Sequence, residues 1–354
     1  MSIVVERRGP DPAPVGASPR RRRLTGLACL VVLLAAGAVL SLVIGARALS
    51  PAEVWQGLFG DPGTDQRLVE ITLIVQTLRV PRTVLAVVAG LALGVAGALI
   101  QGHTRNPIAD TGLLGVNAGA SFAVVLAVHL VGLQNPVQYL WFALLGAAAA
   151  GVVVFGLSSL GRGAGNPLTL VLAGQGITIF LTAMTGAVAL ADKQALDVLR
   201  FFNAGSVQGV GWNVIIVASV FIAAGLVLAA LNLPAINLLN LGDDVARGLG
   251  VNIALGRTTG VLAVTLLAGA ATAACGPIAF LGLMVAHVAR WFTGPDYRFL
   301  VPCAGLLGAV VLLFGDMAGR LVVRPAELQA GIVIALLGAP FFAALVWLGK
   351  FRQA

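Results

Sequence analysis

The sequence is poor in charge. Of its 354 residues only 10% are Asp, Glu, Lys or Arg, whereas 59% are hydrophobic. Soluble domains carry about 25% charged residues, so the shortage excludes an ordinary soluble domain and indicates a helical membrane protein. The apolar runs are long and continuous, unlike the alternating segments of about ten residues that build a transmembrane barrel.

Lysine and cysteine are also scarce. The two lysines, Lys193 and Lys350, do not belong to a GxxxxGK[ST] loop, so the chain has no nucleotide site of its own. The three cysteines lie in three different apolar runs without CxxC spacing, which implies neither a disulfide framework nor a metal site. No residue is assigned a catalytic role.

Ionisable side chains are missing from the middle of the apolar runs. All fourteen acidic residues fall in predicted loops or at span ends, and the three histidines also lie near span ends. Ion-coupled transporters usually keep such groups at membrane depth. Coupling to an ion gradient through charged side chains is therefore disfavoured, although backbone carbonyls could still bind sodium.

The apolar runs predict about ten transmembrane helices. They cover approximately residues 24–44, 84–100, 113–131, 139–160, 168–190, 212–231, 258–274, 278–288, 301–317 and 330–348. All tryptophans and tyrosines fall at or beyond the ends of these runs, as in the aromatic belt of a membrane protein. The run after Pro277 is short, and a tilted or partly re-entrant helix is expected there.

Residues 1–23 form a basic tail that is expected to be disordered and cytoplasmic. A signal peptide is the alternative, but the run that follows the tail is long enough to span, which favours an uncleaved first helix. Six arginines in the tail indicate that the N-terminus lies inside, and ten spans then place the C-terminus inside too. The arginines show no interleaving with aromatic residues, so no nucleic-acid partner is expected.

The stretch 79–119 carries an arginine pair, Arg79 and Arg82, around Pro81 at a predicted outer helix start. Arg320 lies at another outer helix end, after Asp316 and near Glu327. Outer arginines run against the positive-inside trend. They could anchor to lipid headgroups, or their planar guanidinium groups could bind acidic groups of a partner or substrate.

Two short helices are predicted outside the membrane. Ser50-Pro51-Ala52-Glu53 is a capping box that starts an outer helix ending near Gly60, followed by a polar loop to Arg79. On the inner side, residues 242–251 predict a helix capped by Asp243, which also lies four residues before Arg247 and could pair with it. Its apolar positions are Leu241, Val245 and Leu249. Such a helix either docks into a groove of a cytoplasmic partner or lies on the membrane surface.

Several ordered motifs resemble the FecCD family of ABC-importer permeases, which serve iron-siderophores, haem and vitamin B12. The resemblance covers about residue 25 to the C-terminus. The matching motifs are Arg79-Val80-Pro81-Arg82-Thr83, Gln101, Asn106-Pro107-Ile108-Ala109, Gly112-Leu113-Leu114-Gly115-Val116, the helix at 242–251, Gly276-Pro277-Ile278-Ala279-Phe280-Leu281-Gly282-Leu283, Gly315-Asp316-Met317-Ala318-Gly319-Arg320 with Glu327, and Gly338-Ala339-Pro340.

The resemblance implies a type II importer permease domain over residues 24–354, located in the bacterial cytoplasmic membrane. It implies a second permease subunit, as a homo- or heterodimer, two cytoplasmic ATP-binding subunits that hold ATP and Mg²⁺, and an extracytoplasmic binding protein. This chain would bind no cofactor and would not be an enzyme. Arg79, Arg82 and Arg320 would dock the binding protein. The coupling helix would comprise Gly242, Asp243, Asp244, Val245, Ala246, Arg247, Leu249 and Gly250.

The expected function is inward transport of ferric-siderophore complexes, driven by ATP that the partner subunit hydrolyses. A vitamin B12 or haem permease of the same family is one alternative. An ion-coupled secondary transporter that acts alone is the alternative from another class.

Overall fold

The computed structural model describes residues 19–45, 47–133, 135–159, 167–323 and 326–347. Within these ranges every regular element is helical, as predicted. The elements, in chain order, are α1 (Pro19–Val43), α2 (Pro51–Phe59), α3 (Gln66–Leu73), the π-helix η1 (Ile74–Arg79), α4 (Val80–Thr104), the 3-10 helix η2 (Thr111–Leu114), α5 (Val116–Val131), α6 (Pro136–Ser159), α7 (Pro167–Ala191), α8 (Lys193–Ala204), α9 (Trp212–Leu239), α10 (Asp243–Gly248), α11 (Ile253–Cys275), α12 (Leu281–Thr293), α13 (Tyr297–Val322) and α14 (Ala330–Trp347).

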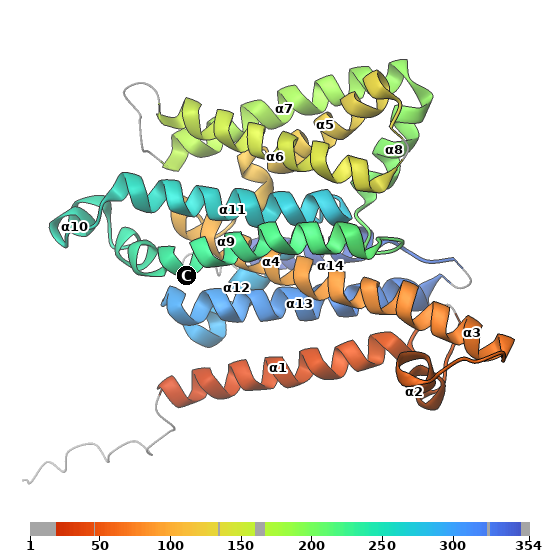
Figure 1. The fold of residues 1–354 in the computed structure, drawn as a ribbon. Helices are drawn as coiled ribbons and strands as arrows, with labels where there is room; N and C mark the ends of the chain where they lie inside the picture. Colours follow the sequence, from red (N-terminus) through yellow and green to blue (C-terminus); the bar gives the residue numbers. More distant parts are fainter. Residues whose placement is uncertain (1–18, 46, 134, 160–166, 324–325, 348–354) are drawn as a thin grey trace, which may run out of the picture.

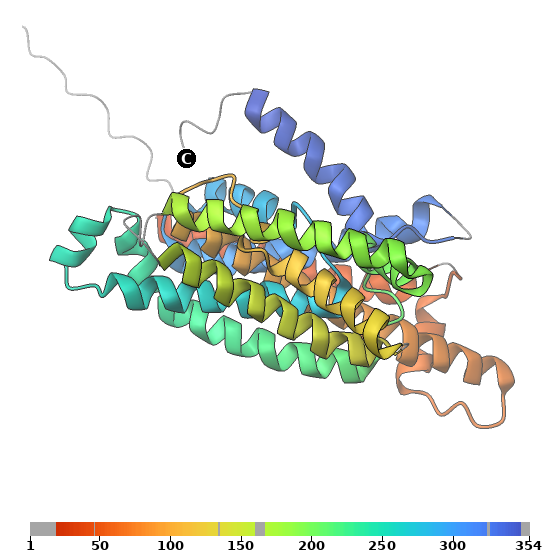
Figure 2. The ribbon, with the colours of Figure 1, turned by 90° about the horizontal axis from the view of Figure 1, so that it is seen from above.

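The long helices lie side by side along one common direction (Figure 1). α10 lies at one end of this bundle, and α2 and α3 lie at the other, so we call these the α10 end and the α2 end. α4 runs from the α2 end to the α10 end and packs against α13, α11, α12 and α9. α14 diverges from the other helices when the bundle is seen from above (Figure 2).

All ten predicted spans are found as helices. Among the described residues, eight helical stretches are long and apolar enough to cross a membrane. The other two predicted spans correspond to α5, with 16 residues, and α12, with 13. α12 is short because the chain turns at Phe280, which has a positive φ of 64°, and becomes helical only from Leu281.

The predicted polar loop before Arg79 is wrong over most of its length. α3 begins after its N-cap Asp65 and continues through η1 into α4, which gives one helical stretch of 39 residues, Gln66–Thr104. Ile71 and Val75 on this stretch are buried together with Val54 of α2. The polar residues that suggested a loop therefore form the exposed face of an amphipathic helix.

The capping box of α2 is confirmed. Glu53 N donates to Ser50 Oγ at 3.3 Å, and Ser50 N donates to the Glu53 carboxylate at 2.8 Å. The helix ends at Phe59, with Gly60 as its C-cap. α2 is therefore held at a fixed place beside α3 at the α2 end.

Most of the predicted disordered tail lies outside the described residues. The described chain is already helical from Pro19, so the last residues of the segment 1–23 belong to α1. Proline is favourable in the first turn of a helix because no intrahelical partner is lost there. The candidate membrane span within α1 begins only at Arg23, and the domain boundary at residue 24 stays a prediction.

α4 is the buried centre of the bundle. Nearly all its residues from Leu85 to Thr104 are buried. A Cβ on Gly94 would lie 2.1 Å from the carbonyl oxygen of Ala304, and one on Gly97 would lie 2.4 Å from the carbonyl of Gly282. Backbones in contact at these points leave no room for a side chain, as is usual where membrane helices pack on small residues.

Candidate functional site

The three predicted docking arginines gather at the α2 end, where two of them share one aspartate. Arg82 donates to Asp316 through Nε at 3.0 Å and through Nη2 at 2.7 Å. Arg320, one helical turn after Asp316 on α13, donates through Nε to Asp316 Oδ2 at 3.0 Å, an oxygen that also accepts from Arg82 Nε. Arg82 also pairs with Glu327. We call these four residues the Asp316 cluster; its two positive and two negative charges balance.

The Asp316 cluster also holds the end of α1. Arg320 Nη1 donates to the carbonyl oxygens of Ser41 and Ile44, each at 2.9 Å. The Ser41 hydroxyl lies 2.8 Å from the hydroxyl of Thr83 on α4. The last carbonyls of a helix have no intrahelical partner, and a cation placed there is favourable. Arg320 therefore joins α13 to α1 as well as to α4.

Arg79 also binds the C-terminal end of α1. Its guanidinium donates to the carbonyls of Leu42 at 2.5 Å and Val43 at 2.8 Å, and to that of Arg47. A Cβ on Gly45 would lie 2.7 Å from Arg79 Nη2, so the glycine leaves space for the guanidinium. Within the described part of the chain Arg79 forms no ion pair, and it satisfies three backbone acceptors.

All three arginines are buried in this chain. Arg79 is 5% exposed, Arg82 9% and Arg320 1%. The sequence predicted their common location but not their engagement by Asp316, Glu327 and the end of α1. Their docking role stays a prediction.

Exposed ion pairs at the α2 end were missed at the sequence level. Arg67 of α3 donates to Glu53 of α2 at 2.8 Å, and Arg47 pairs with Glu70. These side chains are more exposed than the buried arginines, since Arg67 is 72% exposed. The sequence did not predict these ion pairs because it predicted a loop over residues 66–79, which are helical.

The α10 end presents the predicted coupling segment as a short exposed helix. Ala246 is buried, whereas Leu241, Val245 and Leu249 are exposed. α10 ends with two reverse hydrogen bonds, Gly250 N to Arg247 O and Val251 N to Ala246 O, each 3.0 Å. This is a Schellman motif with Gly250 at the left-handed position, φ 84°, as expected for a glycine stop.

Two details of the predicted helix are wrong. The N-cap of α10 is Gly242, with φ 115°, and the first helical residue is Asp243, whose side chain does not cap the helix. Arg247 pairs with Asp244 at 3.2 Å rather than with Asp243. The Asp243 carboxylate is drawn away because two arginines from other helices reach it.

Those two arginines are Arg105 and Arg257. Arg105 is the C-cap of α4, with a left-handed φ of 48°, and its Nη2 donates to Asp243 Oδ1 and, at 2.6 Å, to Leu239 O at the end of α9. Arg257 in the first turns of α11 donates to Asp243 Oδ2 at 2.7 Å. We call these three residues the Asp243 cluster. It joins α4, α9, α10 and α11 at one point.

A second polar link lies deeper between the same helices. His103 Nε2 of α4 is 2.9 Å from Asn232 Oδ1 of α9, and Asn232 Nδ2 donates to Gly256 O of α11 at 2.6 Å. A Cβ on Gly260 would lie 1.8 Å from His103 Nε2, so the imidazole packs directly on the α11 backbone. His103 and Asn232 are buried. The C-terminal part of α4, at the α10 end, is thus fixed to α9 and α11.

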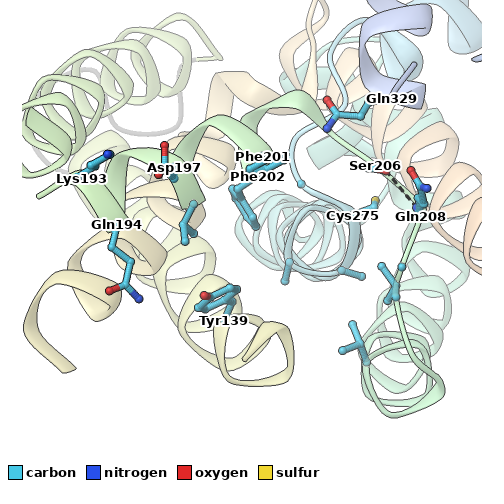
Figure 3. A pocket seen from close by; sticks show the side chains of 17 residues that line it. Tyr139, Lys193, Gln194, Asp197, Phe201, Phe202, Ser206, Gln208, Cys275 and Gln329 are labelled. Atoms are coloured by element: carbon cyan, nitrogen blue, oxygen red, sulfur yellow. Dashed lines mark hydrogen bonds between the residues drawn. The ribbon is translucent and has the colours of Figure 1, made fainter. Parts of the chain in front are cut away.

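A cavity of about 1000 Å³ opens beside α8 near the α2 end (Figure 3). Side chains of α8, of the segment before α9 and of the end of α11 line it. Its charged residues are Lys193 and Asp197, and Gln194, Gln208 and Gln329 add uncharged polar groups. The cavity therefore has a mixed lining without a large net charge.

In the part of the chain that the structure describes, no three His, Cys, Asp or Glu side chains gather as a metal site. A polytopic bundle with a small-residue interior and with its ion pairs at the two ends has the construction of a membrane permease. The chain belongs to the FecCD transport family, whose model matches residues 32–348. It is a permease subunit of the ABC-importer type and a multi-pass membrane protein.

Relatives match nearly the whole chain. It is 43% identical to the ferric enterobactin transport system permease protein FepD of Escherichia coli (strain K12), covering 90% of this chain and 93% of that protein. It is 37% identical to the hemin transport system permease protein HmuU of Yersinia pestis, covering 93% of this chain and 95% of that protein. A solved structure described as an inward-facing conformation of a metal-chelate type ABC transporter superposes with a TM-score of 0.78 at 27% identity, covering 92% of this chain and 99% of that one.

Proposed function

We propose that the chain passes ferric-siderophore complexes inward across the bacterial cytoplasmic membrane, driven by ATP that a separate subunit hydrolyses. The observation that carries the proposal is the exposed apolar surface at α10, formed by Val245 of the helix, Leu241 before its N-cap and Leu249 at its C-cap. It is held at the bundle end by charged contacts and offers a partner an apolar surface. The ferric enterobactin permease among the relatives favours a ferric chelate as substrate.

The proposed partners occupy different faces of the chain. Two ATPase subunits, which hold ATP and Mg²⁺, would meet α10 and its counterpart on a second permease subunit. That second subunit, identical or related, would cover part of the exposed apolar surface of α7 and α14. The α10 end and both termini would then be cytoplasmic, and this chain would carry out no catalysis and bind no cofactor.

A substrate-binding protein would dock at the α2 end. Glu327 pairs with Arg82 at the edge of the Asp316 cluster, where the Glu327 side chain is 16% exposed and the Arg82 side chain 10%. A carboxylate of the binding protein could replace Glu327 on Arg82, because an arginine fork suits a planar carboxylate. On this proposal Arg79 and Arg320 act from beneath the surface, by holding α1 and Asp316 in place.

The cavity beside α8 supports a bulky ligand without choosing between chelates. Its volume of about 1000 Å³ and its mixed lining suit passage of a large, partly polar molecule. Haem and vitamin B12 remain the alternatives within the family, and haem has support from the hemin permease among the relatives. Competition between ferric siderophore, haem and vitamin B12 for uptake would separate them.

The test is uptake into proteoliposomes that contain the chain with its partner permease and ATPase, supplied with binding protein and ferric siderophore. We expect concentrative uptake only with ATP and Mg²⁺, and none from the chain reconstituted alone. Uptake by the chain alone under a proton or sodium gradient would refute the proposal and support the ion-coupled alternative.

A further inference from the structure

The small helix α10 has few anchors other than the Asp243 carboxylate. Of the α10 residues only Ala246 is buried, and the side chain of Asp244 is 99% exposed. The connections on either side contain Gly242 and Gly250 in positive-φ conformations. Such short glycine turns do little to fix the direction of a helix of six residues. The orientation of α10 therefore depends strongly on the contacts of Asp243.

Asp243 divides its two oxygens between two helices. Oδ1 accepts from Arg105 at the end of α4, and Oδ2 accepts from Arg257 at the start of α11. The side chains are partly shielded, with exposures of 32% for Asp243, 35% for Arg105 and 16% for Arg257. Partial shielding strengthens charged hydrogen bonds relative to fully exposed ones.

Arg105 is fixed in place by more than this pair. Its backbone ends α4 in a left-handed conformation, which a non-glycine residue adopts at an energetic cost. Its guanidinium also donates to Leu239 O, so movement of Asp243 acts on a group already held by α4 and α9. Both hydrogen bonds come from the same nitrogen, Nη2, which therefore holds Leu239 O and Asp243 Oδ1 side by side.

α4 reaches from the Asp243 cluster to the Asp316 cluster. Its 25 residues span about 37 Å at the rise of an α-helix. Backbone contacts at Gly94 and Gly97 prevent it from bending independently of α13 and α12. At its far end it supplies Arg82 to Asp316. Each end of the same buried helix thus supplies an arginine to an aspartate of another helix.

We infer that Asp243 is the positioning residue that couples α10 to the rest of the permease. When a cytoplasmic ATPase displaces α10, Asp243 transmits the displacement to Arg105 and Arg257. The C-terminal end of α4 and the N-terminal end of α11 then move, and α4 carries the movement to the Asp316 cluster. The inference rests on the proposed function, because it takes α10 as the surface that the ATPase contacts. It assigns the coupling to the Asp243 carboxylate and not to the exposed apolar side chains at α10.

The decisive variant is Asp243→Asn in the assembled transporter, since it keeps the size of the side chain and removes its charge. The measurements are co-purification of the ATPase, ATP hydrolysis, and substrate transported per ATP hydrolysed in proteoliposomes. Because the apolar face of α10 is unchanged, we expect the ATPase to co-purify and hydrolyse ATP. Transport per ATP should fall about tenfold, within the range of typical coupling between sites.

Two further variants separate coupling from folding. Asp243→Glu retains the charge and should restore at least half of the wild-type ratio. Asp244→Asn removes one charge from the same helix without touching α4 or α11; any effect of it should fall on ATPase co-purification, and the ratio should stay at the wild-type value. An unchanged ratio in Asp243→Asn, or an equal fall in Asp243→Asn and Asp244→Asn, would overturn the inference.

Failure of the proposed function would look different. In that case the wild-type chain itself would not co-purify with an ATPase, or it would transport without ATP. A melting temperature of Asp243→Asn close to that of wild type would show that a lower ratio is not caused by a loss of folded protein.

Discussion

Replacing Asp316 by asparagine would leave two buried arginines without their shared counter-charge. Asp316 and Arg320 are each 1% exposed, and Arg82 is 9% exposed. Removing one partner of a buried ion pair typically costs 3–5 kcal/mol. Glu327 still faces Arg82, and the Ser41 and Ile44 carbonyls still accept from Arg320, so we place the loss at the lower end, about 3 kcal/mol.

The assay is thermal unfolding of the purified protein in detergent, with Glu70→Gln as the matched control. Glu70 also belongs to an arginine–carboxylate pair at the α2 end, but its side chain is 57% exposed. An exposed pair contributes about 0–1 kcal/mol, so the control should unfold close to wild type while Asp316→Asn unfolds several degrees lower. Equal melting temperatures for Asp316→Asn and Glu70→Gln would refute the reasoning about the cluster.

A doubly reversed variant, which carries Arg79→Glu and Arg320→Glu together, tests the docking role and the buried contacts of these arginines. Arg320→Glu would place a second carboxylate beside Asp316 and against two helix-end carbonyls, so it should lower the melting temperature as well as weaken docking. Arg79→Glu would likewise present a carboxylate to three carbonyls. Loss of binding-protein affinity in the doubly reversed variant therefore counts as evidence for docking only where the variant remains folded. A variant that keeps the wild-type melting temperature would contradict the buried contacts of both arginines.

The remaining predictions concern the α10 face, helix packing and pH. Val245→Asp with Leu249→Asp should abolish co-purification of the ATPase without changing the melting temperature, since both side chains are exposed; retained co-purification would remove the docking role. Gly97→Val should lower the yield of folded protein strongly, whereas Gly26→Val, with no atom within 4 Å of the added carbon, should not; equal yields would contradict the close backbone contact. Hydrogen bonds in the capping box lower the pKa of Glu53 from 4.5 to about 2, so stabilisation of α2 is present above pH 4.5 and is lost as the pH falls through about 2. Protection of the α2 amides from hydrogen exchange, taken relative to the intrinsic exchange rate at each pH, should fall in the same pH range, and protection that does not change with pH would contradict it.

The fold was largely predictable from the sequence because burial in a membrane leaves long apolar runs. Each of the ten runs corresponds to a helix, although α5 and α12 are shorter than the others. The segment from Gln66 to Arg79 was missed because its polar residues lie on one face of a helix that packs on α2. Hydropathy averages over both faces and cannot separate such a helix from a loop.

The candidate sites were predictable in location but not in contacts. Spacing within one helix suggested that Asp243 pairs with Arg247, since residues four apart are neighbours. The actual partners, Arg105 and Arg257, come from elsewhere in the chain, and such pairs leave no periodic signal. For the same reason the sequence indicated Arg82 and Arg320 as outer cations without showing that Asp316 neutralises them both.

The continuous helix from Gln66 to Thr104 has a practical consequence. Its 39 residues extend about 58 Å at the rise of an α-helix, nearly twice the thickness of about 30 Å of a hydrocarbon core. The part formed by α3 must therefore project from the lipid, braced by α2. A rigid protein module could be inserted between α2 and α3, at residues 61–65. Its direction in electron-microscopy images would then show the tilt of α4 inside the membrane, because α3 and α4 form one helical stretch.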